Sequence, residues 1–150
     1  MTRQSLSAFL VALQFGLIAM LAVDAAPAFV DASAPAGAWL SAVCGGLLGV
    51  WSLASNRPGN FNIRPLPRDG GRLVQSGPYR WIRHPMYSAV LLCGIAWVWA
   101  NPLPRAWLEM VALVAVLVIK ALLEERWMQD AHPDYADYRA RTRRFLPGIF

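Results

Sequence analysis

The sequence predicts an all-α integral membrane protein with four transmembrane helices arranged as two hairpins. Of its 150 residues 57% are apolar and only 15% are charged, whereas soluble domains are nearer a quarter charged. The apolar residues fall into four segments, and arginines gather in two of the stretches outside them. The length suits one membrane domain, residues 1–150, and the apolar content excludes a disordered chain.

The first hairpin is predicted within residues 1–55. A helix needs about 20 residues to cross roughly 30 Å of hydrocarbon. Residues 6–23 carry no charge and a single amide, Gln14, and residues 36–54 carry no charge. Arg3 and the small residues after the first run loosely resemble a secretory signal. The run is long for such a signal, so we expect a retained transmembrane helix.

The second hairpin is predicted within residues 86–123. Residues 86–100 are apolar but short for a span, and by length alone they also fit a buried helix. The next residues contain two prolines and predict a tight turn. Residues 107–123 are again apolar, with one charge near each end. Because the turn makes the two segments antiparallel neighbours, we interpret both as spans.

The distribution of arginine predicts the orientation in the membrane. The loop of residues 24–35 holds two aspartates and no basic residue. The positive-inside rule therefore places both termini and the connector, residues 56–85, in the cytoplasm, and we take the membrane to be a bacterial inner membrane. Residues 124–150 then form a cytoplasmic tail. The connector holds Arg57, Arg64, Arg68, Arg72, Arg80 and Arg83, and the tail holds Arg126, Arg139, Arg141, Arg143 and Arg144.

Charge and composition narrow the class of partner. A net charge of +5 suits nucleic acid or anionic lipid. Because the arginines abut apolar spans and lack a stacking pattern, nucleic acid is excluded and membrane lipids are expected. Gly45 and Gly49 allow a helix to approach closely, either within the chain or in a homodimer. Cys44 and Cys93 lie in apolar segments and are interpreted as small hydrophobic residues.

The end of the connector contains glycine, proline, aromatic and histidine residues, which a positively charged membrane anchor does not need. It reads GRLVQSGPYRWIRHPMY over residues 71–87. Pro85 fits the first turn of the third helix, so His84 lies just before a helix N-terminus, where an imidazole and backbone N–H groups suit an anion. A metal site built from His84, His132 and a glutamate lacks the expected spacing, as does a Ser or Cys nucleophile with a His base.

Two adjacent carboxylates, Glu124 and Glu125, follow the fourth segment. Neighbours on a helix point about 100° apart, so at most one of them faces a common site. The alternative interpretation is a solvated helix end that pairs with Lys120 and Arg126. A carboxylate that entered lipid would cost roughly 2.5–3.5 kcal/mol on insertion scales, so these two are expected at the membrane edge.

The tail predicts a short amphipathic helix on the membrane surface. Tyr135 and Tyr138 are three residues apart and share a helix face. Two aspartates lie near the start of this helix, and Arg141 and Arg144 lie near its end, which matches the helix dipole.

The strings GRLVQSGPYRWIRHPMY, LLEE and DYADYRARTRRFLP, taken in this order, resemble the isoprenylcysteine carboxyl methyltransferase family. These are integral-membrane methyltransferases related to phospholipid N-methyltransferases. The resemblance covers roughly residues 62–150. It implies that S-adenosylmethionine is held by the carboxy-terminal hairpin and the cytoplasmic segments beside it. The implied cofactor-binding residues are Gly71, Arg72, Leu73, Val74, Tyr79, His84, Pro85, Met86, Tyr87 and Glu125.

The resemblance also implies catalytic roles for His84 and Lys120. The family often has an arginine, one turn before its glutamates, that is proposed to meet a substrate carboxylate. Lys120 stands at that place and keeps the charge without the bidentate fork. A carboxylate or thiolate acceptor would need no general base. An amine would have to lose a proton, and His84 would then be the candidate base.

The sequence therefore predicts an S-adenosylmethionine-dependent membrane methyltransferase acting on a lipophilic or small acceptor at the cytoplasmic face. Such an enzyme holds the reactive methyl group in line with a nucleophile and excludes water. Two alternatives stay open. One is a related fold that uses NADPH as a membrane reductase, and the other is a non-enzymatic membrane protein for transport or assembly. The identity of the acceptor is also open.

Overall fold

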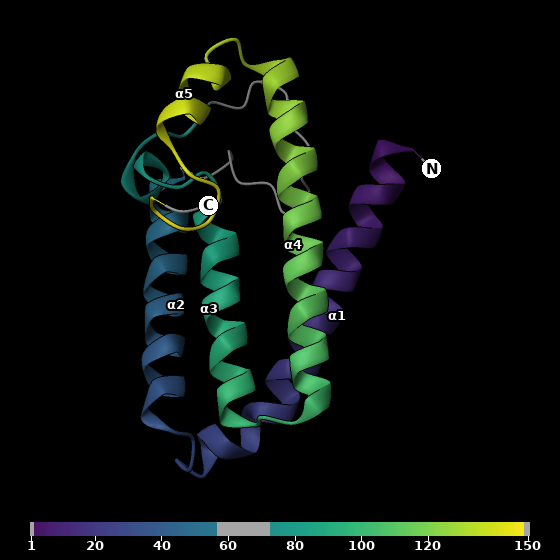
Figure 1. Ribbon diagram of the computed structural model, residues 1–150, viewed down its shortest axis with the longest axis vertical. Coiled ribbons are helices and arrows are strands. Elements are labelled where there is room, and N and C mark those ends of the chain that lie inside the picture. The colour runs from purple at the N-terminus through teal and green to yellow at the C-terminus, as the bar shows by residue number, and fades with distance from the viewer. Residues whose placement is uncertain (1, 57–72, 149–150) are drawn as a thin grey trace.

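The computed structural model describes residues 2–56 and 73–148. Over these residues the chain is helical apart from one isolated parallel β-bridge between Ile82 and Arg143. Four long helices stand side by side, and the described ends of the chain lie toward the same end of the bundle (Figure 1). The helices are α1 (Arg3–Val30), α2 (Ala36–Ser55), α3 (Pro85–Ala100), α4 (Pro104–Ala131) and α5 (Tyr135–Arg141), with a short 3-10 helix η1 (Gly77–Arg80).

α1 is longer than the predicted segment of residues 6–23. It begins after Thr2, whose hydroxyl accepts a hydrogen bond from the backbone N–H of Ser5, and it continues through Pro27 to Val30. The predicted loop of residues 24–35 was therefore too long, because the small and apolar residues after Val23 continue the helix. Leu10, Leu17 and Leu21 line a core with residues of α3 and α4. The first segment is thus an integral part of the bundle.

α2 and α3 pack closely because of one small residue. A Cβ atom added at Gly45 would lie 2.8 Å from Sγ of Cys93 and 2.9 Å from the carbonyl oxygen of Ala89, both in α3. Ser41 of α2 also donates a hydrogen bond to the carbonyl of Leu92 at 2.7 Å. Gly45 therefore serves packing within the chain, where the sequence left a homodimer as the alternative.

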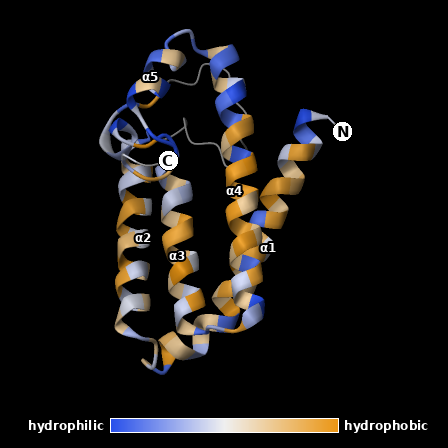
Figure 2. Ribbon diagram, viewed as in Figure 1, coloured by the Kyte–Doolittle hydropathy of each residue, from blue (hydrophilic) through white to orange (hydrophobic). Residues whose placement is uncertain are grey.

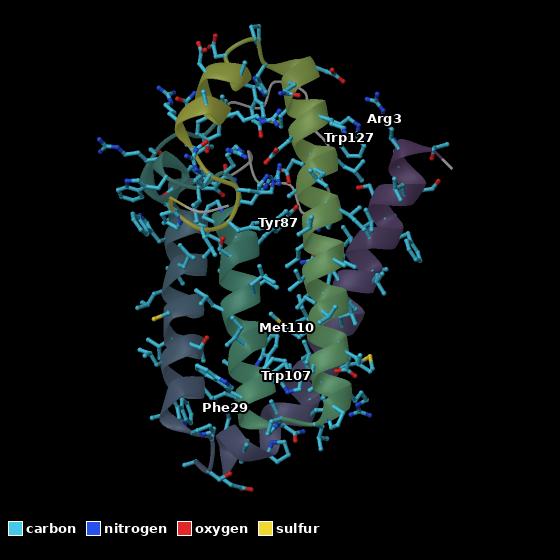
Figure 3. All side chains as sticks on the ribbon, viewed as in Figure 1. Arg3, Phe29, Tyr87, Trp107, Met110 and Trp127 are labelled. Atoms are coloured by element: carbon cyan, nitrogen blue, oxygen red, sulfur yellow. The ribbon has the colours of Figure 1, made fainter. Side chains whose placement is uncertain are left out.

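α4 extends beyond the apolar segment of residues 107–123. It runs from Pro104, in its first turn, to Ala131, so both adjacent glutamates lie inside it. The residues after Leu123 are mostly good helix formers, and the next proline is Pro133. The helix therefore continues through the predicted boundary between hairpin and tail, and the point where the chain leaves the membrane stays a prediction. Trp127, 7% exposed, is buried on this extension, and Arg3 of α1 lies over its ring (Figure 3).

α1, α2 and α4 are long and apolar enough to cross a membrane. α3, with 16 residues, is apolar but shorter. Hydrophobic residues dominate the middle of the bundle, and hydrophilic ones gather at its ends, above all at the end that carries α5 (Figure 2). Large hydrophobic side chains are exposed on α1, α2 and α4, as expected for helices that face lipid.

α5 is shorter than the predicted surface helix. Tyr135 and Tyr138 are both buried, which confirms that they share a face. The helix ends at Arg141, so Arg144 is not in its last turn. Arg144 instead lies in a bend that directly follows Arg143, the residue of the β-bridge.

Candidate functional site

Two segments that are distant in sequence lie side by side at the arginine-rich end. The backbone N–H of Arg83 donates to the carbonyl of Arg143 at 2.7 Å, and that of His84 donates to the carbonyl of Arg144 at 3.0 Å. The N–H of Arg143 in turn donates to the carbonyl of Trp81 at 3.0 Å. This pairing fixes the end of the connector against the tail, directly before α3 begins.

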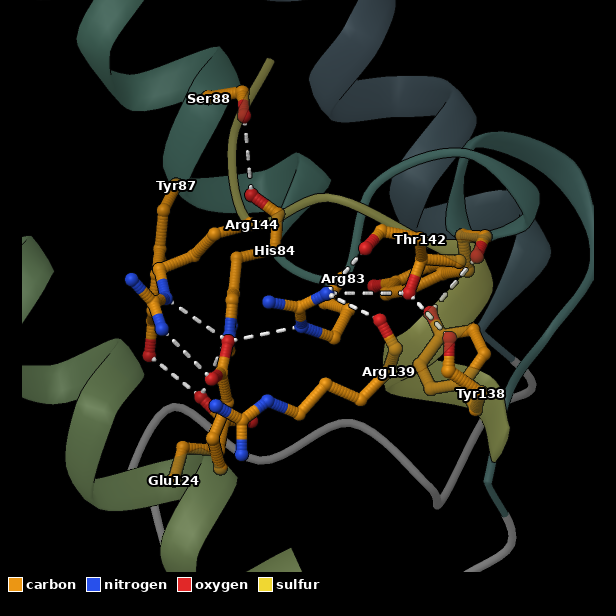
Figure 4. Close-up of polar contacts among 11 residues, drawn as sticks. Arg83, His84, Tyr87, Ser88, Glu124, Tyr138, Arg139, Thr142 and Arg144 are labelled. Carbon is orange, nitrogen blue, oxygen red and sulfur yellow. Dashed lines mark hydrogen bonds and ion pairs between the residues drawn. The ribbon is translucent and has the colours of Figure 1, made fainter. Parts of the chain in front are cut away.

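Glu125 pairs with one arginine from each of these two segments, Arg83 and Arg144, which are labelled in Figure 4. Its Oε1 accepts hydrogen bonds from Nε of Arg83 at 2.9 Å and Nε of Arg144 at 3.0 Å, and lies 3.2 Å from Nε2 of His84. Its Oε2 accepts from Nη2 of Arg144 at 3.0 Å. The side chain is 5% exposed. A buried carboxylate can persist here because two guanidinium groups compensate its desolvation. The same bonds raise the pKa of Arg144.

The guanidinium of Arg83 joins the tail a second time. Its Nη1 donates to the carbonyl oxygen of Thr142 at 2.5 Å and to the carbonyl oxygen of Arg139 at 3.3 Å. The hydroxyl of Ser88, one turn into α3, donates to the carbonyl of Phe145 at 2.7 Å. The tail is thus held by side chains from both the connector and α3.

Glu124 has different surroundings from its neighbour. Its side chain is 33% exposed. Its Oε2 accepts a hydrogen bond from the hydroxyl of Tyr87 at 3.1 Å and lies 3.6 Å from Nδ1 of His84. The two glutamates differ in their other partners but both lie beside His84, so the expectation that at most one of them faces a common site was wrong at this residue. The partners of Glu125 are Arg83, His84 and Arg144, so the alternative of a solvated pair with Lys120 and Arg126 was wrong for this residue.

Two side chains that contact Glu124, those of His84 and Tyr87, belong to a cluster of rings. The rings of His84 and Tyr87 are parallel, with centroids 5.3 Å apart, and Phe145 lies 5.9 Å from His84. Burial and then the charge of Glu124 raise the pKa of Tyr79 to about 12, against the lowering effect of a hydrogen bond with Asn56. Tyr79 is thus a neutral phenol near Glu124. A partly exposed carboxylate beside aromatic faces is an environment that attracts a cation.

Lys120 lies one turn before Glu124 and is almost completely buried. Its ammonium donates a hydrogen bond to Oε1 of Gln14 in α1. The same Nζ lies 5.2 Å from the centroid of the Tyr87 ring. Residues from α1, α3 and α4 therefore meet beside the two glutamates, and Tyr87 points from α3 into this space (Figure 3).

The structure brings most of the predicted site residues together. Tyr79 lies in η1, His84 precedes α3 and Pro85 occupies its first turn, as predicted. Tyr87 follows on the same helix, and Lys120 and both glutamates come from α4. Leu73, Val74 and Met86 are half-buried. Gly71 and Arg72 lie outside the described residues. In the described part of the chain, no group of three or more His, Cys, Asp or Glu side chains is arranged to hold a metal ion.

Sequence reasoning missed three residues of this cluster. Arg83 counted only as a topology charge, although it directly precedes His84. Arg144 counted as a topology charge and as the end of the tail helix, although it lies in the string DYADYRARTRRFLP. Gln14 was noted as the one amide of an apolar run. A lone amide in a transmembrane segment is a usable signal, because it needs a hydrogen-bond partner in the bundle.

The fold and this cluster together define a small helical protein of membrane type, with a polar site at one end of its apolar helices. Residues 36–134 match the phospholipid methyltransferase family, and the chain belongs to that family of integral-membrane methyltransferases. The resemblance found in the sequence is thereby confirmed. The match leaves out α1, with Gln14, and the tail from Tyr135 onward, with Arg144.

One curated relative is the cobalt-zinc-cadmium resistance protein CzcN of Cupriavidus metallidurans. It is 37% identical to this chain over 84 residues. The matched stretch covers 55% of this chain and 38% of the relative, so the chain spans well under half of the relative's length. No solved structure matches the chain.

Proposed function

We propose that this protein is an S-adenosylmethionine-dependent methyltransferase that acts on a lipophilic or small acceptor at the cytoplasmic membrane face. Membership of the family supports the reaction class. The observation that carries the proposal is the pairing of residues 81–84 with residues 143–144 around Glu125. This pairing leaves Glu124, Tyr87 and His84 gathered at the end of the apolar helices.

The described residues fit the cofactor. S-adenosylmethionine supplies a methyl group on a sulfonium cation. Glu124 offers a partly exposed carboxylate and Tyr87 and Tyr79 offer aromatic groups, which suit the positive charges of such a molecule. We keep three apolar residues as proposed cofactor contacts, namely Leu73, Val74 and Met86. Three further residues are proposed on the family resemblance alone, namely Gly71, Arg72 and Pro85.

The two glutamates take different roles in this proposal. The carboxylate of Glu125 already binds Arg83, His84 and Arg144, so we assign it to positioning these residues. Glu124 is the carboxylate that we place toward the cofactor. This assignment replaces the expectation that Glu125 completes the pocket, because the Glu125 side chain is 5% exposed and already compensates two guanidinium groups, whereas that of Glu124 is 33% exposed.

Lys120 and His84 are the residues that we assign to the acceptor. Lys120 lies one turn before Glu124, toward the apolar part of α4. In this proposal the positive charge of Lys120 orients a carboxylate or thiolate acceptor. Gln14 holds its ammonium in place. His84 is positioned by its contacts with the two glutamates, and it is the proton acceptor if the methyl acceptor is an amine. Burial of this cluster excludes water from the transfer.

We further propose that all four long helices cross the membrane, with both termini in the cytoplasm, in a bacterial inner membrane. The described arginines of the connector and tail lie at one end of the bundle, and the loop with Asp31 lies at the other (Figure 1). This distribution agrees with the positive-inside rule. α3 has only 16 residues, but it stands beside α2 over much of the length of that helix (Figure 1).

Ligand-induced stabilisation tests the proposal. The detergent-purified protein should unfold at a higher temperature with S-adenosylmethionine or its demethylated product than without, and NADPH should have no such effect. At a ligand concentration of 100 Kd the expected gain is about 2.7 kcal/mol. Stabilisation by NADPH alone would favour the reductase, and no stabilisation by either ligand would favour a non-enzymatic role. Glu124→Gln should abolish the gain while the unliganded protein unfolds nearly as the parent does.

A further inference from the structure

We propose that a second site, a cavity between the connector and α5, binds the phosphate group of an anionic phospholipid. The cavity is lined by Gln75, Arg80, Tyr138 and Arg141 and has a volume of about 390 Å³. None of these residues belongs to the methyl-transfer site proposed above. The proposal therefore stands independently of that function.

The walls of the cavity are tied to each other. The hydroxyl of Tyr138 donates a hydrogen bond to the carbonyl of Tyr79 at 2.8 Å, which joins α5 to η1. The guanidinium of Arg141 hydrogen-bonds to the side-chain oxygen of Gln75. Tyr138 is buried and gives the cavity a rigid floor. The two segments are therefore held in place before any ligand binds, which lowers the entropic cost of binding.

The charge of the cavity suits a phosphate. Arg80 and Arg141 are exposed and bring two guanidinium groups to its lining, and none of the described residues that line it is acidic. Over residues 2–56 and 73–148, no ion pair joins either guanidinium to an acidic side chain. Planar guanidinium groups bind phosphate oxygens with two parallel hydrogen bonds, so this pair is complementary to a phosphomonoester or phosphodiester.

The position of the cavity indicates a lipid rather than a soluble phosphate. Arg80 directly precedes Trp81, whose ring lies 5.8 Å from that of Trp51, near the end of α2. Both tryptophans are nearly half exposed, at 49% and 45%. Tryptophan gathers at the level of lipid headgroups, so the neighbouring arginine lies at the depth of the phosphates. Basic pockets at the cytoplasmic ends of membrane helices bind anionic headgroups in this way.

The cavity is separated from Glu124 and Tyr87 of the methyl-transfer site by the ion-pair network, and it adjoins that site at Tyr79, whose backbone carbonyl accepts the hydrogen bond from Tyr138. Tyr138 and Thr142 lie at one end of this network, and Tyr87 and Glu124 lie at the other, with Arg83 and His84 between them (Figure 4). Loss of a ligand from one site should therefore leave the other site able to bind.

The test compares two double variants with the same net charge. Arg80→Gln/Arg141→Gln removes both guanidinium groups of the cavity. Arg139→Gln/Arg143→Gln removes two exposed arginines of the same tail that do not line it. Each protein is released from nanodiscs of dioleoylphosphatidylcholine with dioleoylphosphatidylglycerol, and the lipids that stay bound are counted by native mass spectrometry. The unfolding temperature in lipid-free detergent checks that each variant is folded.

The parent should retain phosphatidylglycerol in preference to phosphatidylcholine. The cavity variant should lose this retention at least about tenfold, whereas the control variant should change less than about twofold. Equal losses in the two variants, or equal retention of the two lipids, would overturn the site. If millimolar inorganic phosphate displaces the lipid and stabilises the parent equally well, the ligand is soluble phosphate and the lipid assignment is wrong. If the cavity variant no longer binds the demethylated cofactor product, the cavity belongs to the methyl-transfer site and the proposal fails.

Discussion

At the scale of single residues, the adjacent side chains of Glu124 and Glu125 differ in burial and in partners, and we assign them different roles. Glu125 is 5% exposed and bonded to three cationic or imidazole groups, whereas Glu124 is 33% exposed and touches Tyr87 and His84. A buried, fully paired carboxylate holds structure together, and a partly exposed one remains able to bind a ligand. Substitution of each residue should therefore affect a different measurement.

Glu125→Gln should lower the free energy of unfolding by about 3–5 kcal/mol, the usual cost of breaking a buried ion pair. The guanidinium groups of Arg83 and Arg144 would lose the charge that compensates their burial. Heat unfolding in detergent measures the effect, and Glu124→Gln, with its more exposed side chain, is the matched control. A Glu125→Gln protein as stable as the parent would mean that this network does not hold the tail.

Gln14→Leu should destabilise the protein by about 1–3 kcal/mol, because the buried ammonium of Lys120 would lose one of its acceptors. Gln14→Glu keeps an acceptor at the same place and should recover most of the loss. Both variants are compared by heat unfolding. If Gln14→Leu and Gln14→Glu are equally stable, the contact between α1 and Lys120 is not important for the bundle.

At the scale of helices, the packing of α2 on α3 depends on Gly45. A side chain at this position meets the backbone of α3, which cannot give way as a flexible side chain could. The neighbouring Gly46 has open space around it. The two glycines therefore offer a substitution and its control on one helix.

Gly45→Val should force α2 and α3 apart and cost about 1–3 kcal/mol, whereas Gly46→Val should be nearly neutral. Because His84 and Tyr87 lie at the start of α3, Gly45→Val should also weaken stabilisation by the demethylated cofactor product. The measurements are unfolding temperatures with and without this ligand. Equal behaviour of the two variants would contradict the close approach of the helices.

At the scale of the whole molecule, the number of spans decides which face of the membrane holds the site. α3 has only 16 residues, so by length alone it fits either a short membrane span or a buried helix. If it crosses the membrane, the loop before α2 and the turn before α4 lie on one side, and the tail lies on the other.

Single cysteines test this topology in a background in which Cys44 and Cys93 are replaced by alanine. Ser33→Cys and Pro102→Cys, both exposed, should react with a membrane-impermeant thiol reagent from outside intact cells. Arg143→Cys should react only after the membrane is opened. If Pro102→Cys and Ser33→Cys react from opposite sides, α3 does not span and the four-helix topology is wrong.

Much of the architecture follows from local properties of the chain. Apolar runs need a helix in lipid because the backbone must satisfy its own hydrogen bonds, so four helical segments were predictable from composition. Helix ends were less predictable. α1 and α4 both continue beyond their apolar runs, because the small residues and good helix formers that follow these runs keep the helical conformation, whereas hydropathy marks only the part that suits lipid.

By itself the sequence determined the helical membrane class, the distribution of arginine between the two ends of the apolar segments, and the family, since these depend on residue type and order. Only the tertiary structure decided which glutamate is paired and that Arg83, Arg144 and Gln14 belong to the cluster. The physical reason is that a hydrogen bond depends on distance and direction between groups far apart in the chain. Such geometry exists only after the connector and tail have folded against the same end of the bundle.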